Sequence, residues 1–414
     1  MIAPEGVFVA KSYGQLARSS NGGEDFGAAT NSRIERVRIA SSLMIGTVNS
    51  PRYTPMDYWE SFSDPLSKDS MLYTYGGSQT IPANTPFPVR SPNGLITFNT
   101  SVPFDLVQNT SVKVLNPITS KMVAGFNNEI WMANRLADFI GTPEWFRIAS
   151  SANTIGSVTN KSKYNGGLVS KVKFTNNGNT VFIGSESGHL FRITNLSCAS
   201  DSVYGDIGSN KSNVIGKLIG IFPRRITDIA TDPTDSNKII VVLGGGYNQG
   251  DYLYRCASAL NVPAITGTTV NTSNFELIQN NMVLMPVYSA IIDYTDGNKV
   301  LLGTEAGVYG SDNAWDVAPS SVSWSDVSNG IAKVPILKLT QQTFGSEFGI
   351  AGSGIIYAAS AGRGAFKTNS LANGINPTIG SESIANNKLK IYPNPANDFV
   401  NLEYKLIKDS DVSI

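Results

Sequence analysis

Short apolar runs that end in a small residue recur along this chain at a nearly constant spacing. In each repeat, a run rich in Val, Ile or Leu reaches a glycine or an alanine, and a turn and a second apolar run follow. The stretches 180–192 and 299–310 are the clearest examples. The small residues that close the runs stand at positions 10, 76, 125, 184, 244, 303 and 358, so four of the six intervals measure 55 to 60 residues.

A β-rich repeat of this length predicts the blades of a β-propeller, in which each blade is a sheet of four antiparallel strands. Within a unit, a first strand such as 226–230 precedes an Asp and a turn, and the apolar run forms the second strand. A third strand follows, and a strand with Trp145 or Trp324 closes some units. The repeat therefore predicts an all-β fold with seven blades, with six or eight blades as alternatives.

The ends of the array are incomplete. The unit that closes at position 76 aligns without a gap, from Asp64 onward, with the unit that starts at Asp232. The first unit begins at its apolar run 7–10 without a preceding strand, and the last has no fourth strand after Phe366. Neither a basic segment nor an apolar leader follows the first residue. We therefore expect residues 1–368 to form a propeller that lacks N-terminal sequence.

The composition argues against several classes of partner and cofactor. The 32 basic and 32 acidic residues balance, so nothing favours nucleic acid or an anionic membrane as partner. No apolar run is long enough to predict a transmembrane segment. Cys198 and Cys256 are expected to be free thiols, with a disulfide between them as the alternative. His189, the single histidine, cannot build a histidine metal site alone, so no metal or cofactor is predicted.

A turn motif near the N-terminus provides a family resemblance. Residues 19–26 resemble the Asp-box (BNR repeat) S-x-D-x-G-x-x-W of sialidase-like and sortilin-like propellers. The matching turn residues are Ser19, Asn21, Gly23 and Phe26, with Asn in place of Asp and Phe in place of Trp. Asn forms the same hydrogen bond to its own backbone as Asp. The resemblance extends over residues 7–368, and because Asp-boxes are structural it implies the fold and no activity.

The C-terminal stretch carries a second, more specific resemblance. A strand at 389–392 is stopped by two prolines, and a second strand with alternating apolar residues begins at 400, which predicts a hairpin. The hairpin resembles the start of the C-terminal sorting domain of type IX secretion (Por) substrates of Bacteroidetes. The residues that carry the resemblance are Tyr392, Pro393, Asn394, Pro395 and Asp398.

The second resemblance implies an address and a domain order. It implies contact with the type IX secretion machinery, followed by release or attachment at the cell surface. The expected domains are the propeller at 1–368, a flexible linker at 369–387 and, at 388–414, the start of an immunoglobulin-like β-sandwich that the sequence leaves incomplete.

Two carboxylates are the candidates for chemistry. A propeller glycoside hydrolase needs two carboxylates that face each other across a channel or a cleft. Asp228 lies on a first strand, and Asp293 stands at what the repeat predicts to be the matching place of the next unit. The alternative is that each is a polar residue near the end of its strand. A sialidase is disfavoured, because Ala149 follows a Phe-Arg-Ile sequence where that family has Pro.

Aromatic residues in the stretch 50–100 are candidates for ligand binding. Tyr53, Tyr58 and Trp59 can stack on sugar rings, or they can fill a core beneath a long insertion. The sequence as a whole predicts a secreted or outer-membrane-attached cell-surface protein. Its predicted role is that of a non-catalytic binding or adhesion scaffold for a glycan or a protein. A propeller-type glycoside hydrolase is the alternative.

Overall fold

The computed structural model describes residues 7–10, 16–19, 51–67, 70–91, 97–134, 145–155, 158–199, 213–343, 353–368, 390–392 and 401–403. Within these ranges the chain is built of strands, and the helical segments are two short 3-10 turns, η1 (Leu196–Cys198) and η2 (Pro319–Ser321). None of the described segments is a helix of the length and apolarity that crossing a membrane requires.

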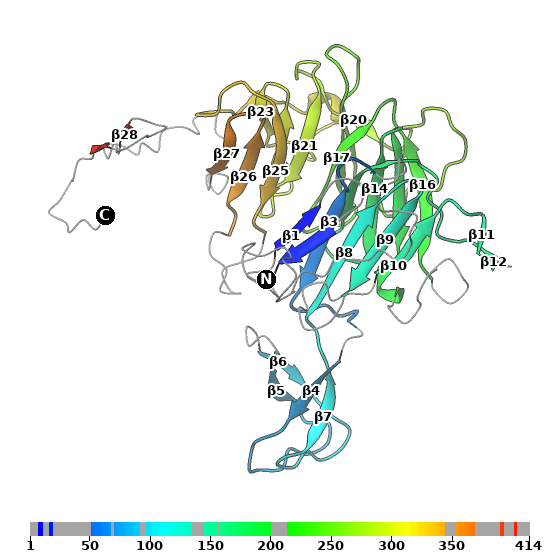
Figure 1. The fold of residues 1–414 in the computed structure, drawn as a ribbon, viewed down its shortest axis with the longest axis vertical. Helices are drawn as coiled ribbons and strands as arrows, with labels where there is room; N and C mark the ends of the chain where they lie inside the picture. The colour runs from blue at the N-terminus through cyan, green and yellow to red at the C-terminus, as the bar shows by residue number, and fades with distance from the viewer. Residues whose placement is uncertain are drawn as a thin grey trace, which may run out of the picture.

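Five antiparallel sheets follow one another along the chain (Figure 1). The first contains β3 (Met56–Ser61), β8 (Thr119–Gly125), β9 (Glu129–Asn134) and β10 (Trp145–Ser150). The second contains β13 (Val169–Phe174), β14 (Thr180–Ser185), β15 (His189–Thr194) and β16 (Ile215–Ile221). The third contains β17 (Ile226–Thr231), β18 (Ile239–Leu243), β19 (Leu253–Cys256) and β20 (Glu276–Leu277).

The last two sheets complete the array. The fourth contains β21 (Val287–Ile292), β22 (Val300–Thr304), β23 (Gly307–Ser311) and β24 (Ser325–Asp326). The fifth contains β25 (Ile336–Gln341), β26 (Ile356–Ser360) and β27 (Gly364–Thr368). This sheet has three strands in the described residues, and residues 369–389 lie outside them, so the absence of a fourth strand after Phe366 stays a prediction.

Smaller two-stranded sheets make up the rest. Their strands are β1 (Val7–Ala10) with β2 (Leu16–Ser19), β4 (Ser70–Thr74) with β7 (Ser111–Leu115), β5 (Phe87–Arg90) with β6 (Thr97–Thr100), β11 (Thr154–Ile155) with β12 (Val158–Thr159), and β28 (Lys390–Tyr392) with β29 (Asn401–Glu403).

The first strands of the five sheets lie side by side. β3 contacts β13, β13 contacts β17, β17 contacts β21 and β21 contacts β25. Each sheet then continues outward through its second and third strands (Figure 1). This is the arrangement of a β-propeller, with five blades in the described residues, in which the first strands line a central channel.

Glycines in the second strands allow neighbouring blades to approach closely. A Cβ atom on Gly184 would lie 2.7 Å from Cγ2 of Ile226, and a Cβ atom on Gly303 would lie 2.6 Å from the carbonyl oxygen of Ile336. Ile226 and Ile336 each open the first strand of the following blade. Gly125 has the same relation to the blade that follows it. The glycine repeat of the sequence therefore marks the contacts between blades.

The prediction of seven blades is wrong, because two predicted units form a single blade. Asp64 does match Asp232: the backbone N–H of Asp64 donates to Pro117 at 2.9 Å, and that of Asp232 donates to Lys238 at 3.0 Å. However, the second strand of the Asp64 blade is β8, which follows an insertion. The run that closes at position 76 belongs to β4 and pairs with β7 inside this insertion. Positions 76 and 125 therefore count one blade twice.

The run at 7–10 does not form a blade either, because β1 pairs with β2 alone in the described residues. The remaining closing positions, 125, 184, 244, 303 and 358, are separated by 59, 60, 59 and 55 residues and match the five blades. Burial distinguishes the second strands of four blades from β4, whereas β26 of the last blade alternates between buried and exposed residues. β4 alternates between exposed and half-buried residues, whereas β14, β18 and β22 are buried along their whole length.

The insertion between β3 and β8 has a core of its own. β4 to β7 enclose a cluster of buried apolar side chains that is separate from those of the blades: Phe87, Val89, Val102, Leu106, Val112 and Val114. In Figure 1 these strands project away from the propeller. The insertion therefore packs as a unit, which explains why its β4 imitates a blade strand in the sequence.

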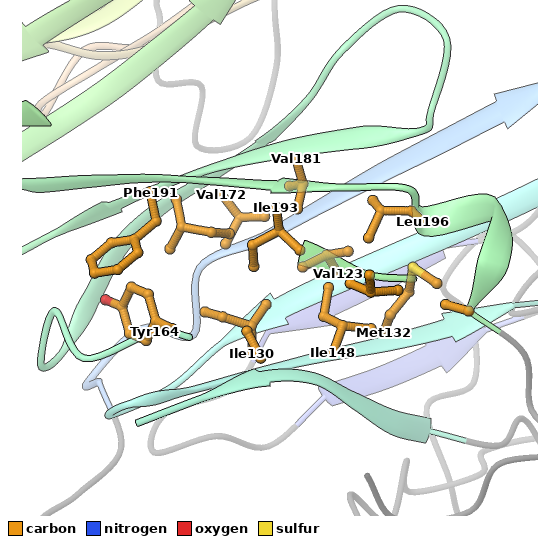
Figure 2. Packing of buried hydrophobic residues seen from close by; sticks show 14 of the residues in the cluster. Val123, Ile130, Met132, Ile148, Tyr164, Val172, Val181, Phe191, Ile193 and Leu196 are labelled. Atoms are coloured by element: carbon orange, nitrogen blue, oxygen red, sulfur yellow. The ribbon is translucent and has the colours of Figure 1, made fainter. Parts of the chain in front are cut away.

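Apolar side chains fill the space between blades. Figure 2 shows the cluster between the first two blades, where Ile130, Met132 and Ile148 face Val172 and Ile193. The rings of Tyr164 and Phe191 close one end, with their centroids 4.8 Å apart. Each such buried side chain contributes about 1.5–3 kcal/mol through removal of its apolar surface from water. Packing of this kind makes the first strands a rigid frame for the channel.

Two further predictions concern cysteines and the C-terminus. Cys198 and Cys256 are both free thiols, as expected.

β28 and β29 pair in an antiparallel manner with Ile391 opposite Leu402, which confirms the predicted hairpin. The linker 369–387 and most of 388–414 lie outside the described residues, so the immunoglobulin-like sandwich stays a prediction.

Candidate functional site

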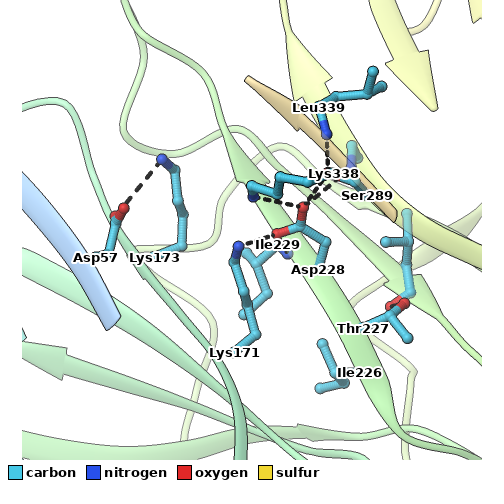
Figure 3. Close-up of polar contacts among 12 residues, drawn as sticks. Asp57, Lys171, Lys173, Ile226, Thr227, Asp228, Ile229, Ser289, Lys338 and Leu339 are labelled. Atoms are coloured by element: carbon cyan, nitrogen blue, oxygen red, sulfur yellow. Dashed lines mark hydrogen bonds and ion pairs between the residues drawn. The ribbon is translucent and has the colours of Figure 1, made fainter. Parts of the chain in front are cut away.

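A β-bulge at the same place in four successive first strands determines which side chains enter the channel. In β13, β17, β21 and β25, the pairing with the second strand skips one residue directly after the first pair. The residues that follow the skip occupy equivalent positions in the four blades: Lys171, Asp228, Ser289 and Lys338. Because a bulge redirects the side chains of its strand, these four polar groups meet in the middle of the propeller (Figure 3).

The skipped residues connect successive blades. The hydroxyl of Ser170 donates to the carbonyl oxygen of Ile226 at 2.6 Å, and the hydroxyl of Thr227 donates to that of Val287 at 2.5 Å. Each bond joins the bulge of one first strand to the opening residue of the next. The bulges therefore fix the spacing of the first strands as well as the direction of their side chains.

Asp228 is the centre of the polar cluster and is 2% exposed. Burial alone would raise the pKa of this carboxyl group, but the ammonium groups of Lys171 and Lys338 outweigh burial and hold the pKa well below its usual range. The carboxylate accepts from Lys171 Nζ (2.7 Å) and the Ile229 backbone N–H (2.9 Å) at Oδ1, and from Ser289 Oγ (2.6 Å), Lys338 Nζ (3.2 Å) and the Ala290 backbone N–H (3.3 Å) at Oδ2.

The two lysines at Asp228 are in different environments. Burial would lower the pKa of Lys171, but the adjacent Asp228 carboxylate raises it above its usual value. Lys338 lies in the channel with 49% of its side chain exposed. Enclosure by protein atoms, together with the neighbouring Lys171 ammonium, lowers the pKa of Lys338 to about 8. Lys338 is therefore the cation that is more open to a ligand.

A second ion pair lies beside the first. Asp57, on β3, is 3.6 Å from Nζ of Lys173 and also accepts the backbone N–H of Phe174 at 2.8 Å. Figure 3 shows this pair across the strand interface from Asp228. Charged side chains from the first, second, third and fifth blades thus line one channel.

The first strands enclose a cavity of about 520 Å³. Its lining contains the charged residues Asp57, Glu60, Lys173, Asp228 and Lys338, uncharged polar residues that include Thr231 and Gln341, and, where the first strands end, Trp59, Asn176, Pro233 and Thr343. Pockets of roughly 300–1,000 Å³ with a few fixed polar groups are typical small-molecule sites. The geometry is that of a binding channel.

The structure places Asp293 differently from the sequence prediction. By register, Ser289 matches Asp228, whereas Asp293 matches Asp232 directly after the first strand. Oδ1 of Asp293 accepts the backbone N–H groups of Thr295 (2.9 Å) and Asp296 (3.1 Å), as Oδ1 of Asp232 does for the residues of its own turn. Oδ2 accepts from Gln341 at 2.6 Å. Asp293 therefore holds a turn and connects two blades.

The three candidate aromatic residues are not in one environment. Tyr53 is 73% exposed, with the Arg52 guanidinium 5.5 Å from its ring centre. Tyr58 packs into the core of the first blade, and burial raises its pKa far above the usual range. Trp59 donates from Nε1 to the carbonyl oxygen of Asn176 at 2.7 Å and lies at the channel cavity. Of the three, Trp59 and Tyr58 line the cavity.

The remaining predicted residues lie elsewhere. His189 opens β15 and contacts the Ser187 hydroxyl at 2.9 Å. No group of metal-binding side chains was found among the described residues. Ser19 ends β2, while Asn21, Gly23 and Phe26 lie outside the described residues. Tyr392 ends β28, and the sorting residues 393–395 and 398 also lie outside them.

Sequence reasoning selected Asp228 but missed Lys171, Lys173 and Lys338. The lysines look like ordinary surface residues of amphipathic strands, and their direction depends on the bulge. The sequence does contain a pattern that marks the channel residues. In each of the four first strands, the polar channel residue stands two positions after the apolar residue that opens the strand. Only the pairing register shows that this residue faces the channel.

Comparisons with known proteins found distant structural similarity. No family model and no curated protein matches this chain. Sqt1 of Chaetomium thermophilum bound to the N-terminus of ribosomal protein L10 is similar over 66% of this chain and 63% of that chain, with 11% identity and a TM-score of 0.35. Sqt1 of the same organism solved alone matches over 66% and 60%, with 10% identity and a TM-score of 0.35. The match thus spans less than two thirds of those chains.

Proposed function

We propose that this chain is a non-catalytic binding scaffold whose channel takes a glycan or part of a protein ligand. The observation that carries the proposal is that other protein groups already engage both candidate carboxylates. Five donors surround Asp228, and Asp293 holds a turn. A glycosidase acid needs a raised pKa, whereas that of Asp228 is lowered. The cavity beside Asp228 remains large enough for a ligand.

A glycan-array screen of the full chain, run in parallel with an assay for released reducing sugar, tests this proposal. Binding without release is the expected result. Release that disappears in Asp228→Asn would overturn it and identify a hydrolase. Silence in both assays from folded protein would contradict glycan binding and favour a protein partner.

We further propose that the protein is exported by the type IX machinery and released or attached at the cell surface. The support is the hairpin β28–β29 together with the Tyr-Pro-Asn-Pro sequence and Asp398. A reporter with a secretory signal peptide, fused to the region 386–414 completed to a full sorting domain, tests it in a type IX-competent bacterium beside the variant Asp398→Ala. Export of the wild type and retention of the variant are expected. Equal retention of both in the periplasm would contradict the proposal.

A further inference from the structure

Hydrogen-bond donors outnumber acceptors on the channel floor. Each lysine ammonium carries three N–H donors, and Lys171, Lys173 and Lys338 share two carboxylates, Asp57 and Asp228. Both oxygens of Asp228 are already occupied by protein donors. Oδ2 of Asp57 also accepts a backbone N–H at 2.8 Å. The three ammonium groups therefore carry more N–H groups than these carboxylates accept, and the cluster has spare donors.

Glu60, the third acidic residue of the cavity lining, does not change the excess of hydrogen-bond donors. Glu60 is 7% exposed and accepts from the Tyr58 hydroxyl at 3.1 Å. It lies on β3, three residues after Asp57, which forms the channel ion pair of this strand. Both oxygens of Asp228 and Oδ2 of Asp57 are thus engaged by protein groups. Of the side chains in these ion pairs, Lys338 is the most exposed.

Lys338 is the lysine best placed to contact a ligand. About half of its side chain faces the channel, and its distance to Oδ2 of Asp228, 3.2 Å, is long for an ion pair. Its pKa, about 8, is lowered by enclosure and by the ammonium groups of Lys171 and Lys173. A negative charge beside Lys338 would relieve this repulsion.

We propose that the channel binds an anionic ligand, with a carboxylate, sulfate or phosphate group seated between Lys173 and Lys338. The inference rests on the proposed binding function and names the chemical class of the ligand. The rest of the ligand occupies the cavity, where Thr231 and Gln341 offer uncharged polar contacts and Trp59 offers an aromatic ring. The cavity volume of about 520 Å³ suits a sugar-sized molecule.

Calorimetric titration of the full chain with glucuronate, glucose 6-phosphate and glucose tests the inference. At pH 7 we expect at least one of the anionic sugars to bind at least tenfold more tightly than glucose. A preference for one anionic sugar distinguishes carboxylate from phosphate. Lys338→Met should remove this preference, and Lys217→Met, which changes an exposed lysine on the outer strand β16, should leave it unchanged.

The pH profile gives a readout that a merely structural lysine would not show. Because Lys338 loses its proton as the pH rises through about 8, the affinity for the anionic sugar should fall about tenfold between pH 7 and pH 9. Lys338→Arg should retain binding and flatten this profile, since arginine stays protonated.

Three results would overturn the inference: equal affinity for glucose and the anionic sugars, unchanged anion binding in Lys338→Met, or no binding of any of the three sugars. The first of these would leave glycan binding intact. The glycan array tests the proposed function separately, so the failure of one proposal is distinguishable from the failure of the other.

Discussion

Nζ of Lys171 lies 2.7 Å from Oδ1 of Asp228, although the two residues belong to the first strands of different blades. Both side chains are largely buried, with 17% and 3% of their surfaces exposed. A pair of this kind is costly to break, since removal of one charge leaves the other without compensation in a poorly solvated place. The pair therefore couples the second and third blades at the channel floor.

Asp228→Asn should destabilise the propeller by about 3 kcal/mol at neutral pH, because it leaves the buried ammonium of Lys171 without its counter-charge. Urea unfolding measures the change. Asp312→Asn is the matched control, because Asp312 is exposed. An equal and small effect of the two substitutions would show that the ion pair does not hold the blades together.

The loss of stability at low pH should depend on the carboxylate of Asp228. The folded-state pKa of Asp228 is lowered, whereas a carboxyl group of the unfolded chain titrates near pH 4. Its ionised form therefore stabilises the fold above about pH 4, and this contribution is lost as the pH falls further. We expect a steeper loss of stability below about pH 4 in the wild type than in Asp228→Asn, measured by urea midpoints at several pH values. Parallel curves would be inconsistent with this assignment.

Gly303→Ala should destabilise the chain by about 1–3 kcal/mol through overpacking between blades. The new Cβ atom would lie 2.6 Å from a backbone oxygen, that of Ile336, which cannot move aside like a flexible side chain. Gly76→Ala is the control, because no atom lies within 4 Å of a Cβ at that position. Thermal denaturation compares the two. Similar melting temperatures for both variants would refute the role of Gly303 at the blade contact.

Trp59 should contribute to stability, whereas Tyr53 should not. A Cβ atom on Gly178 would lie 2.3 Å from the Trp59 ring, so the ring packs directly on the backbone of the second blade. Trp59→Ala removes this packing and the bond to Asn176, and we expect a loss of about 3 kcal/mol. Tyr53→Ala, at a side chain that is 73% exposed, should change the unfolding free energy by less than about 0.5 kcal/mol. Chemical denaturation of both variants checks the contrast.

The fold class follows from the sequence because the repeat has a direct structural cause. Gly184 and Gly303 are required where one blade meets the next, so their spacing carries the architecture. The blade count does not follow, because an apolar run of the insertion stands soon after the Asp64-Pro65 start of the first blade, where it imitates a second strand. A strand becomes a buried blade strand or part of a two-stranded ribbon according to the strands that pair with it, and its own sequence does not show which strands these are.

The channel was accessible to sequence reasoning only in part. Asp228 could be selected because a carboxylate on a strand is conspicuous. The partners Lys171 and Lys338 could not be assigned, because they are 57 and 110 positions away and because a bulge sets the face on which each lies. A shift of one residue in strand register moves a side chain to the opposite face. Asp293 is mismatched because Ser289, four positions earlier, is the counterpart of Asp228, which only the pairing register shows.

The central claim, that the channel takes a ligand, is tested most directly by obstructing the end of the cavity that Trp59 and Thr343 line. Thr343 is exposed and lines the cavity, and Thr268 is exposed on a loop that does not line it. The affinity for the strongest glycan-array ligand should be measured for the wild type, Thr343→Trp and Thr268→Trp. A loss of at least tenfold in Thr343→Trp alone is the predicted result. Equal affinities of all three proteins would contradict binding in the channel.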